Sequence, residues 1–304
     1  MPITHAFQYF KPADVPEAVT LLSKFGRAEV LAGGTDMVNI LKEQAKCSNP
    51  VAGPQSLEAV VDIKGISSLR ELSERDGRLH LGALVTFTEI IESPLVRARV
   101  PVLAEVAMTV GSVGVRNRAT MAGNICSAVP CMDSGPVLRA FDAEIVIEGP
   151  AGRRVVPVAD FFVAPRKTAL QKGDILTGID IPVPPDGHGA CFVKMRRYDG
   201  EDLAQASVLF VALPDDQYRV SFGSVSPVPI RSPRIEQLMA GHPLTDALIA
   251  KAQEFISEEI APLTDIRATR EYRTHMTRIM FERGARAAVA RLEGKGPAYG
   301  ENLV

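Results

Sequence analysis

Apolar residues recur along this chain with two different periods, and the change from one period to the other outlines its elements. Between residues 12 and 25 the apolar positions fall three and four residues apart, which is the helical period. Asp14 stands at the start of this stretch and proline lies in its first turn, as at a helix N-terminus. Apolar runs at 28–32 and 59–63 flank a second helical stretch at 35–45. This order of strand, helix and strand predicts a small β-α-β unit.

The stretch from 66 to 181 mixes both periods and predicts a second lobe with a mixed or antiparallel sheet. Helical patterns lie at 66–73, 86–92 and 101–110, and strand-like runs lie at 78–83, 143–148, 153–156 and 174–181. The turn Gly149-Pro150-Ala151-Gly152 joins two of these strands into a hairpin. Residues 47–56 are rich in Ser, Asn, Pro and Gly and are predicted to form a surface loop.

The rest of the chain predicts a three-stranded antiparallel sheet followed by helices. The strand-like runs lie at 191–196, 206–213 and 218–225, and the helical ones at 233–240, 245–258 and 270–292. Residues 182–190 are rich in proline and glycine, which is typical of a domain boundary. We therefore predict an α+β fold with a two-lobed domain at 1–181 (lobes at about 1–64 and 65–181), a C-terminal domain at 188–293 and a loose tail at 294–304.

Composition excludes several classes of protein. The chain has 304 residues, of which 46% are hydrophobic and 23% charged, and this is an ordinary globular composition with room for two or three domains. A net charge of −2 argues against a nucleic-acid-binding protein, which needs a clustered basic excess. No apolar run approaches the ~20 residues that cross a bilayer, and the N-terminus lacks a secretory signal pattern. We expect a cytoplasmic protein.

The cysteines and histidines form no metal-binding or catalytic pattern. Cys126 and Cys131 do not have the C-x₂-C spacing of zinc sites, so we expect buried thiols, neither metal ligands nor a disulfide framework. The five histidines form no H-E-x-x-H motif. We predict no catalytic side chain and no metal site on this chain. A protein of this kind delegates difficult chemistry to a cofactor.

Two short glycine-bearing loops point to that cofactor. The first, Ala32 to Asp36, follows a predicted strand and opens a predicted helix, and the second, Thr120 to Asn124, repeats the arrangement. Glycine allows close approach of the backbone and a positive φ, and the N–H groups of a helix start suit a phosphate. Two such loops can clamp one diphosphate. Each alone is more typical of a plain turn between elements, and neither carries the G-x-G-x-x-G or P-loop motif.

The loops and several other segments resemble one family in order and spacing. The further segments are Asp62-Ile63, Leu81 to Thr86, Arg116-Asn117-Arg118, and Gly123-Asn124 followed by Pro130-x-x-Asp133. The family is the FAD-binding medium subunit of molybdenum hydroxylases, as in carbon monoxide, xanthine and nicotinate dehydrogenases. The resemblance runs from about residue 4 to about residue 290. It implies that the two-lobed domain binds FAD.

The resemblance also implies which residues hold FAD. The first loop supplies Ala32, Gly33, Gly34, Thr35 and Asp36, the second supplies Thr120, Ala122, Gly123 and Asn124, and Leu84 lies in a segment near the flavin ring. We expect Asp36 to face the backbone or the flavin's polyol, or else to cap a helix. Ala122 stands where the family has glycine. A methyl group there weakens FAD binding if the position needs a positive φ.

Two charged residues complete the implied site. Asp133 falls where the family binds the ribose of the AMP half, and Lys194 falls near the N1/C2 edge of the flavin, where a cation raises its potential. Asp133 is otherwise a helix N-cap, and Lys194 is otherwise an ordinary strand lysine. Tyr198 is expected to act as a lid over the ring. Arg116 and Arg118 are expected to be orienting or interface residues, or else plain surface charges.

The function that the resemblance implies is electron transfer. An oxidoreductase subunit of this kind carries FAD and relays electrons from a small two-iron–two-sulfur subunit to an external acceptor. A large subunit holds the molybdopterin, and the assembly is expected to be a dimer of heterotrimers. The alternatives are an autonomous FAD-dependent oxidase or reductase of the same fold and a scaffold that has lost FAD. The first alternative needs a catalytic base, for which the sequence offers no candidate.

Overall fold

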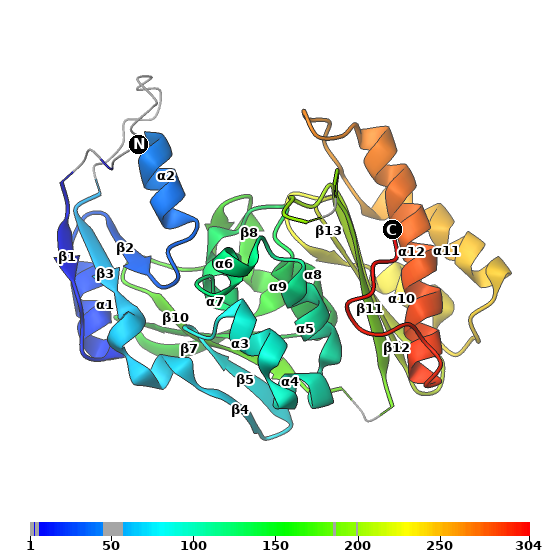
Figure 1. Cartoon of the computed structure of the whole chain (residues 1–304), viewed down its shortest axis with the longest axis horizontal. Helices are drawn as coiled ribbons and strands as arrows, with labels where there is room; N and C mark the ends of the chain where they lie inside the picture. Colours follow the sequence, from blue (N-terminus) through cyan, green and yellow to red (C-terminus); the bar gives the residue numbers. More distant parts are fainter. Residues whose placement is uncertain (1–2, 4–5, 45–56, 185–186, 199) are drawn as a thin grey trace.

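The chain folds into three consecutive units that lie side by side (Figure 1). This computed structural model describes residues 3, 6–44, 57–184, 187–198 and 200–304. The predicted surface loop at 47–56, and Cys47 with it, lies outside the described residues. Across the described ranges, no helix has both the length and the apolar composition that a membrane crossing requires.

The first unit is the predicted β-α-β arrangement with one extra strand. Its parallel sheet has the order β1-β3-β2, with β1 at Gln8–Phe10, β2 at Ala28–Leu31 and β3 at Ala59–Asp62. Its helices are α1 (Val15–Lys24) and α2 (Met37–Gln44). The Asp14 carboxylate caps α1 by accepting a hydrogen bond from the Glu17 N–H group (2.9 Å), as predicted. Strand β1 escaped prediction because three residues are too few to show a period.

The second unit is built on a five-stranded antiparallel sheet of order β4-β5-β10-β6-β7. The strands are β4 (Leu72–Arg75), β5 (Arg78–Gly82), β6 (Glu144–Gly149), β7 (Gly152–Pro157) and β10 (Ile175–Pro182). The helix predicted at 66–73 is wrong: a 3₁₀ turn at Ser67–Arg70 leads directly into β4. Asp76 and Gly77 both have positive φ and form a tight hairpin turn, so the Asp-Gly pair was the overlooked signal.

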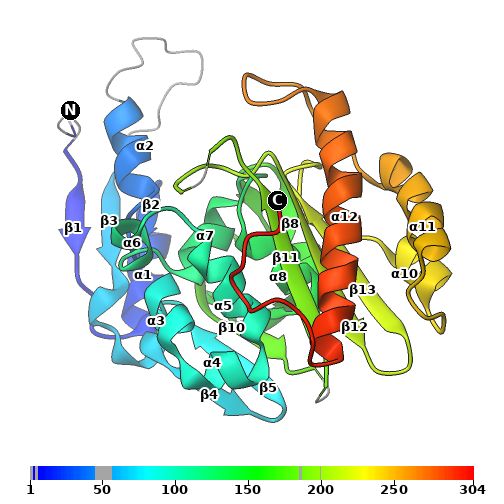
Figure 2. The ribbon, with the colours of Figure 1, turned by 45° about the vertical axis from the view of Figure 1, so that its right-hand side comes forward.

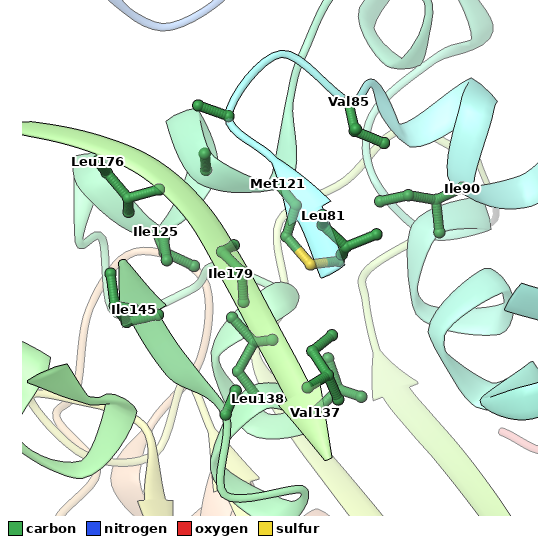
Figure 3. Packing of buried hydrophobic residues seen from close by; sticks show 14 of the residues in the cluster. Leu81, Val85, Ile90, Met121, Ile125, Val137, Leu138, Ile145, Leu176 and Ile179 are labelled. Carbon is green, nitrogen blue, oxygen red and sulfur yellow. The ribbon is translucent and has the colours of Figure 1, made fainter. Parts of the chain in front are cut away.

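Short helices cover the central sheet and connect it to its neighbours. They are α3 (Phe87–Glu92), α4 (Pro94–Arg99), α5 (Pro101–Met108), α6 (Val113–Arg116), α7 (Met121–Ser127), α8 (Ser134–Ala140) and α9 (Val158–Phe161), with a small hairpin of β8 (Phe162–Ala164) and β9 (Lys167–Thr168). Figure 3 shows Ile145 and Ile179 of the sheet packed near Ile125 of α7 and Leu138 of α8. This apolar core holds the start of α7, and with it the second glycine loop, in a fixed position.

The third unit carries four antiparallel strands where three were predicted. They are β11 (Gly189–Met195), β12 (Ala206–Leu213), β13 (Gln217–Gly223) and the short edge strand β14 (Ile230–Arg231), which lies in the proline-rich segment after β13. Helices α10 (Pro233–Met239), α11 (Asp246–Glu259) and α12 (Arg270–Leu292) follow (Figure 2). The rings of Phe281 on α12 and Phe210 on β12 lie 5.5 Å apart and join this helix to the sheet.

The sheet of the third unit buries both of its faces. Phe210 packs in the core beneath α12, whereas Leu209 and Val211, on the opposite face of the same strand, belong to the core of the second unit. On that second face the Ser221 hydroxyl donates a hydrogen bond to the Pro136 carbonyl of α8 (2.7 Å). The second and third units therefore share a continuous apolar interface.

The tail was expected to be loose, but it makes specific contacts. The Arg291 Nε group donates to the Pro297 carbonyl (3.0 Å), and an Arg283 N–H group donates to the Leu303 carbonyl (2.7 Å). The Tyr299 ring lies over the Arg291 guanidinium at 4.0 Å. Arginines of α12 thus hold the tail in place through contacts that its own composition does not reveal.

Candidate functional site

A cavity of ≈ 1060 Å³ lies where the three units meet. All but one of the residues predicted to bind the cofactor line it: Ala32, Gly33, Gly34, Thr35, Asp36, Thr120, Ala122, Gly123, Asn124, Asp133 and Lys194. The exception is Leu84, which is buried in the apolar core and whose N–H group bonds to the Leu69 carbonyl (2.8 Å). Its neighbour Ala83 reaches the cavity wall instead. Leu84 itself therefore does not line the cavity, and its part in holding FAD stays a prediction.

The first glycine loop depends on both of its glycines, for different reasons. Gly34 has a φ of +77°, a conformation that a side chain strains. Gly33 lies so close to the backbone before the second loop that a Cβ atom on it would be 2.1 Å from the Arg118 carbonyl oxygen. The two loops are consequently in direct contact and form one continuous surface of the cavity.

Asp36 lines the cavity, and its expected contact with the flavin's polyol stays a prediction. Its carboxylate accepts a hydrogen bond from the Ser127 hydroxyl of α7 (2.5 Å). Residue 36 follows the first loop and Ser127 ends the helix that the second loop opens. The Asp36–Ser127 bond therefore connects the first glycine loop to the end of the helix that the second loop opens.

The second loop is the first turn of α7. Thr120 is its N-cap and accepts a hydrogen bond from the Gly123 N–H group through its hydroxyl oxygen (3.0 Å). Ala122 is the second residue of the helix, is 5% exposed and does not have a positive φ. The methyl group that replaces the family's glycine is therefore not strained.

Backbone N–H groups from both loops are available at the cavity. In α2 the first intrahelical bond runs from Val38 to the Gly34 carbonyl (3.1 Å), so the N–H groups of Thr35 and Asp36 precede it. In α7 the N–H group of Ala122, a residue of the cavity wall, also precedes the helical bonding, which begins with Asn124 on Thr120 (3.0 Å). Such donors, at the positive end of a helix dipole, attract an anionic group.

Asp133 and Lys194 form a buried ion pair in the cavity wall. Lys194 Nζ lies 2.6 Å from Asp133 Oδ2 and 2.9 Å from the Thr109 carbonyl oxygen. Burial raises the pKa of the Asp133 carboxyl, and the Lys194 ammonium acts against this shift. Asp133 occupies the N-cap position of α8 without capping it. The two residues therefore act at one place, which corrects the expectation that they serve opposite ends of the cofactor.

Two buried oxygen atoms at the cavity lack a hydrogen-bond donor. Asn124 Oδ1 and Asp133 Oδ1 are both inaccessible and have no partner within the described residues. Buried acceptors in native proteins are nearly always satisfied. A ligand that brings hydroxyl groups to this wall would satisfy them.

The structure adds wall residues that sequence reasoning missed. They include Arg27 to Val30 around the start of β2, Val110, Gly111, Arg166, and Gln171 to Leu176 around the start of β10. Arg166 sits at the rim with a φ of 58°, unusual for a residue other than glycine. None of these residues belongs to a recognisable sequence motif, because the packing of the chain alone brings each of them to the cavity.

Two further expectations concern residues near the opening. Tyr198 lines the cavity and is 55% exposed, which suits a lid, and its neighbour Arg197 is held by Asp202 (3.2 Å). Arg116 donates to the Val110 (3.1 Å) and Gly111 (2.7 Å) carbonyl groups, so it orients the cavity wall. Arg118 is exposed and contributes its carbonyl group to the contact with Gly33.

The cysteines differ from expectation in one respect. Cys191 is buried, but Cys126 and Cys131 are partly exposed on the cavity wall. The surrounding protein raises the pKa of the Cys126 thiol to about 12 by desolvation. In the described parts of the chain, no three His, Cys, Asp or Glu side chains come together to hold a metal ion.

Comparison with known proteins identifies this arrangement. Residues 5–184 match the family model described as "FAD binding domain in molybdopterin dehydrogenase", and residues 190–288 match "CO dehydrogenase flavoprotein C-terminal domain". The chain belongs to the FAD-binding medium subunits of the molybdenum hydroxylase family. It is thus a subunit of an oxidoreductase, with FAD as the cofactor of its N-terminal domain. Residues 289–304 lie beyond both matched segments.

Relatives in this family align over nearly the whole chain. The putative xanthine dehydrogenase FAD-binding subunit of Escherichia coli (strain K12) is 30% identical, with 94% of this chain and 97% of that protein covered. The carbon monoxide dehydrogenase medium chain of Hydrogenophaga pseudoflava is 32% identical, with 94% and 98% covered. A solved structure of carbon monoxide dehydrogenase from that organism superimposes with a TM-score of 0.88 at 30% identity, covering 96% of this chain and 99% of the other.

Proposed function

We propose that this chain is the FAD-carrying electron-transfer subunit of a multi-subunit molybdopterin-dependent hydroxylase. The observation that carries the proposal is the cavity between the units, where two glycine loops in direct contact face a buried Asp133–Lys194 pair. Bound FAD supplies the redox chemistry, since a flavin takes up electrons singly and releases two. The residues of this chain bind and orient it.

The donors and acceptors of the wall fit the parts of FAD. Backbone N–H groups of Thr35, Asp36 and Ala122 are placed to bind the diphosphate. The unpartnered oxygen atoms of Asn124 and Asp133 are suited to accept hydrogen bonds from ribityl or ribose hydroxyl groups. The Lys194 ammonium has three N–H groups and uses two of them on Asp133 and Thr109, so one is left for the cofactor.

We further propose the partners that the family resemblance implies. Relatives named as medium chains imply one larger and one smaller partner chain. The larger one would bind molybdopterin, and the smaller one would hold the two-iron–two-sulfur clusters that deliver electrons to the FAD. Assembly as a dimer of heterotrimers and a cytoplasmic location remain predictions.

The test begins with the chain expressed alone. We expect a yellow protein with the visible absorbance bands of a flavin, or a colourless one that acquires them when FAD is added. At 100 times the dissociation constant, FAD should raise the free energy of unfolding by about 2.7 kcal/mol. Protein that stays colourless and takes up no flavin would overturn the proposal. Turnover of a small substrate by the isolated chain would instead indicate an autonomous flavoenzyme.

A further inference from the structure

A second buried ion pair lies behind the cavity wall, at the contact between the second and third units. Glu105 of α5 accepts hydrogen bonds from Arg291 of α12, at 2.8 Å from Nη1 and 3.1 Å from Nη2. The Arg291 side chain is 4% exposed and that of Glu105 is 3% exposed. Two parallel bonds between a guanidinium and a carboxylate fix the mutual orientation of the elements that carry them.

The C-terminal tail closes over this pair. Arg291 donates to the carbonyl groups of Pro297 (3.0 Å) and Ala298 (2.9 Å), and the Tyr299 ring covers its guanidinium. The Gly300 N–H group donates to Glu105 Oε1 (3.4 Å). Figures 1 and 2 show this red segment crossing in front of β11 after it leaves α12. The tail therefore keeps water away from the ion pair.

The same pair holds the strand that carries Lys194. Arg291 Nη1 donates to the Ala190 carbonyl (2.6 Å), and the Phe192 N–H group reaches Glu105 Oε2 (3.5 Å). Because side chains alternate along a strand, Ala190, Phe192 and Lys194 face the same side of β11. Thr109, whose carbonyl group accepts from Lys194, is the C-cap residue of α5 and lies one helical turn after Glu105.

We propose that Glu105, Arg291 and Tyr299 are positioning residues for Lys194. They fix β11 against α5, and this register keeps the Lys194 ammonium at the cavity wall beside Asp133. A buried ion pair is weak evidence for stability, because apolar side chains of similar size often replace it without loss, so its geometric effect is the better explanation. The proposal rests on the proposed function, since the ammonium faces the FAD cavity.

The first test is a thermodynamic cycle on FAD affinity. The double variant Glu105→Leu/Arg291→Met leaves no unpaired charge, and we expect it to raise the dissociation constant for FAD about tenfold. In a Lys194→Met background the same double change should alter the dissociation constant for FAD less than about twofold, because the ammonium group that the pair positions is absent. Equal factors in the two backgrounds, or no change in the wild-type background, would overturn the proposal.

Tyr299 offers a milder variant if the double variant fails to fold. Tyr299→Ala should weaken FAD binding in the same Lys194-dependent way. Tyr299→Phe should restore most of the affinity, because the ring covers Arg291 and the hydroxyl adds only one long hydrogen bond from the Ala190 N–H group (3.4 Å). Arg286→Met is the matched control on the same helix, since Arg286 pairs with Asp246 and Glu282 on the surface. A Tyr299→Phe variant as weak as Tyr299→Ala would contradict this mechanism.

A readout without FAD separates this proposal from the function itself. Acetylation of the FAD-free protein, followed by peptide mass spectrometry, reports how well each lysine is protected. We expect Lys194 to be protected in the wild type and labelled in the Tyr299→Ala variant, relative to the exposed Lys251. Equal protection of Lys194 in both proteins would overturn the positioning role. A wild type that protects Lys194 yet binds no FAD would overturn only the proposed function.

Discussion

Asp133 of the second unit and Lys194 of the third form a buried ion pair, with 2.6 Å between Oδ2 and Nζ. The pair joins two parts of the chain at the wall of the FAD cavity. Because the carboxylate balances the ammonium, the site presents a hydrogen-bonding group and not an isolated positive charge. The proposed effect of Lys194 on the flavin potential is therefore smaller than that of an unpaired cation.

Asp133→Asn should be destabilising, because it leaves the Lys194 ammonium buried without a counter-ion. We expect the free energy of unfolding to fall by about 3–5 kcal/mol in urea titrations of the FAD-free protein. The control is Glu258→Gln, which breaks an exposed pair with Arg234 and should cost at most ~1 kcal/mol. Similar losses in both variants would contradict the importance of burial.

Gly33→Ala should separate the two glycine loops. The new Cβ atom would lie 2.1 Å from the Arg118 carbonyl oxygen, and backbone atoms cannot yield as a flexible side chain does. We expect a loss of about 1–3 kcal/mol of stability and at least a tenfold weaker FAD affinity, or about 1.4 kcal/mol. Calorimetric titration of FAD measures the affinity. Gly65→Ala is the control, because its Cβ atom meets open space. Normal FAD binding by Gly33→Ala would refute the contact between loops.

Ala122→Gly restores the residue usual in the family, and it tests whether the departure matters. Because Ala122 does not have a positive φ, we expect FAD affinity to change less than about threefold. Stability should fall by about 0.5–1 kcal/mol, since glycine is a poorer helix residue. The two effects are measured by FAD titration and by thermal unfolding. A large gain in affinity would show that the methyl group obstructs the cofactor.

The cavity thiol Cys126 should react slowly with alkylating reagents near neutral pH. Burial raises its pKa to about 12, and only the thiolate is nucleophilic. Its thiolate fraction, and hence its labelling rate by iodoacetamide, should rise about tenfold for each pH unit between 7 and 9. Peptide mass spectrometry with glutathione as an internal standard measures the rate. Rapid labelling of Cys126 at pH 7.5 would contradict the raised pKa of this thiol.

Elements with a clear period or turn signal were predictable from the sequence. The helix opened by Asp14, the strands at 206–213 and 218–225, and the helix at 270–292 all appear close to their expected bounds. Strand β4 was missed because its side chains are partly or fully exposed and carry no apolar alternation. Strand β14 was missed because two residues exist as a strand only through their pairing with β13.

The amino-acid sequence by itself determined the local part of the site. Gly34 and Thr120 act through the conformation and capping of their own segments, which are encoded within a few residues, whereas the need for Gly33 comes from its distant neighbour Arg118. Tertiary structure alone decided which distant groups meet: Asp36 with Ser127, Asp133 with Lys194, and Glu105 with Arg291. Those pairings depend on how three units pack through shared apolar faces, and packing of this kind leaves no periodic trace in the sequence.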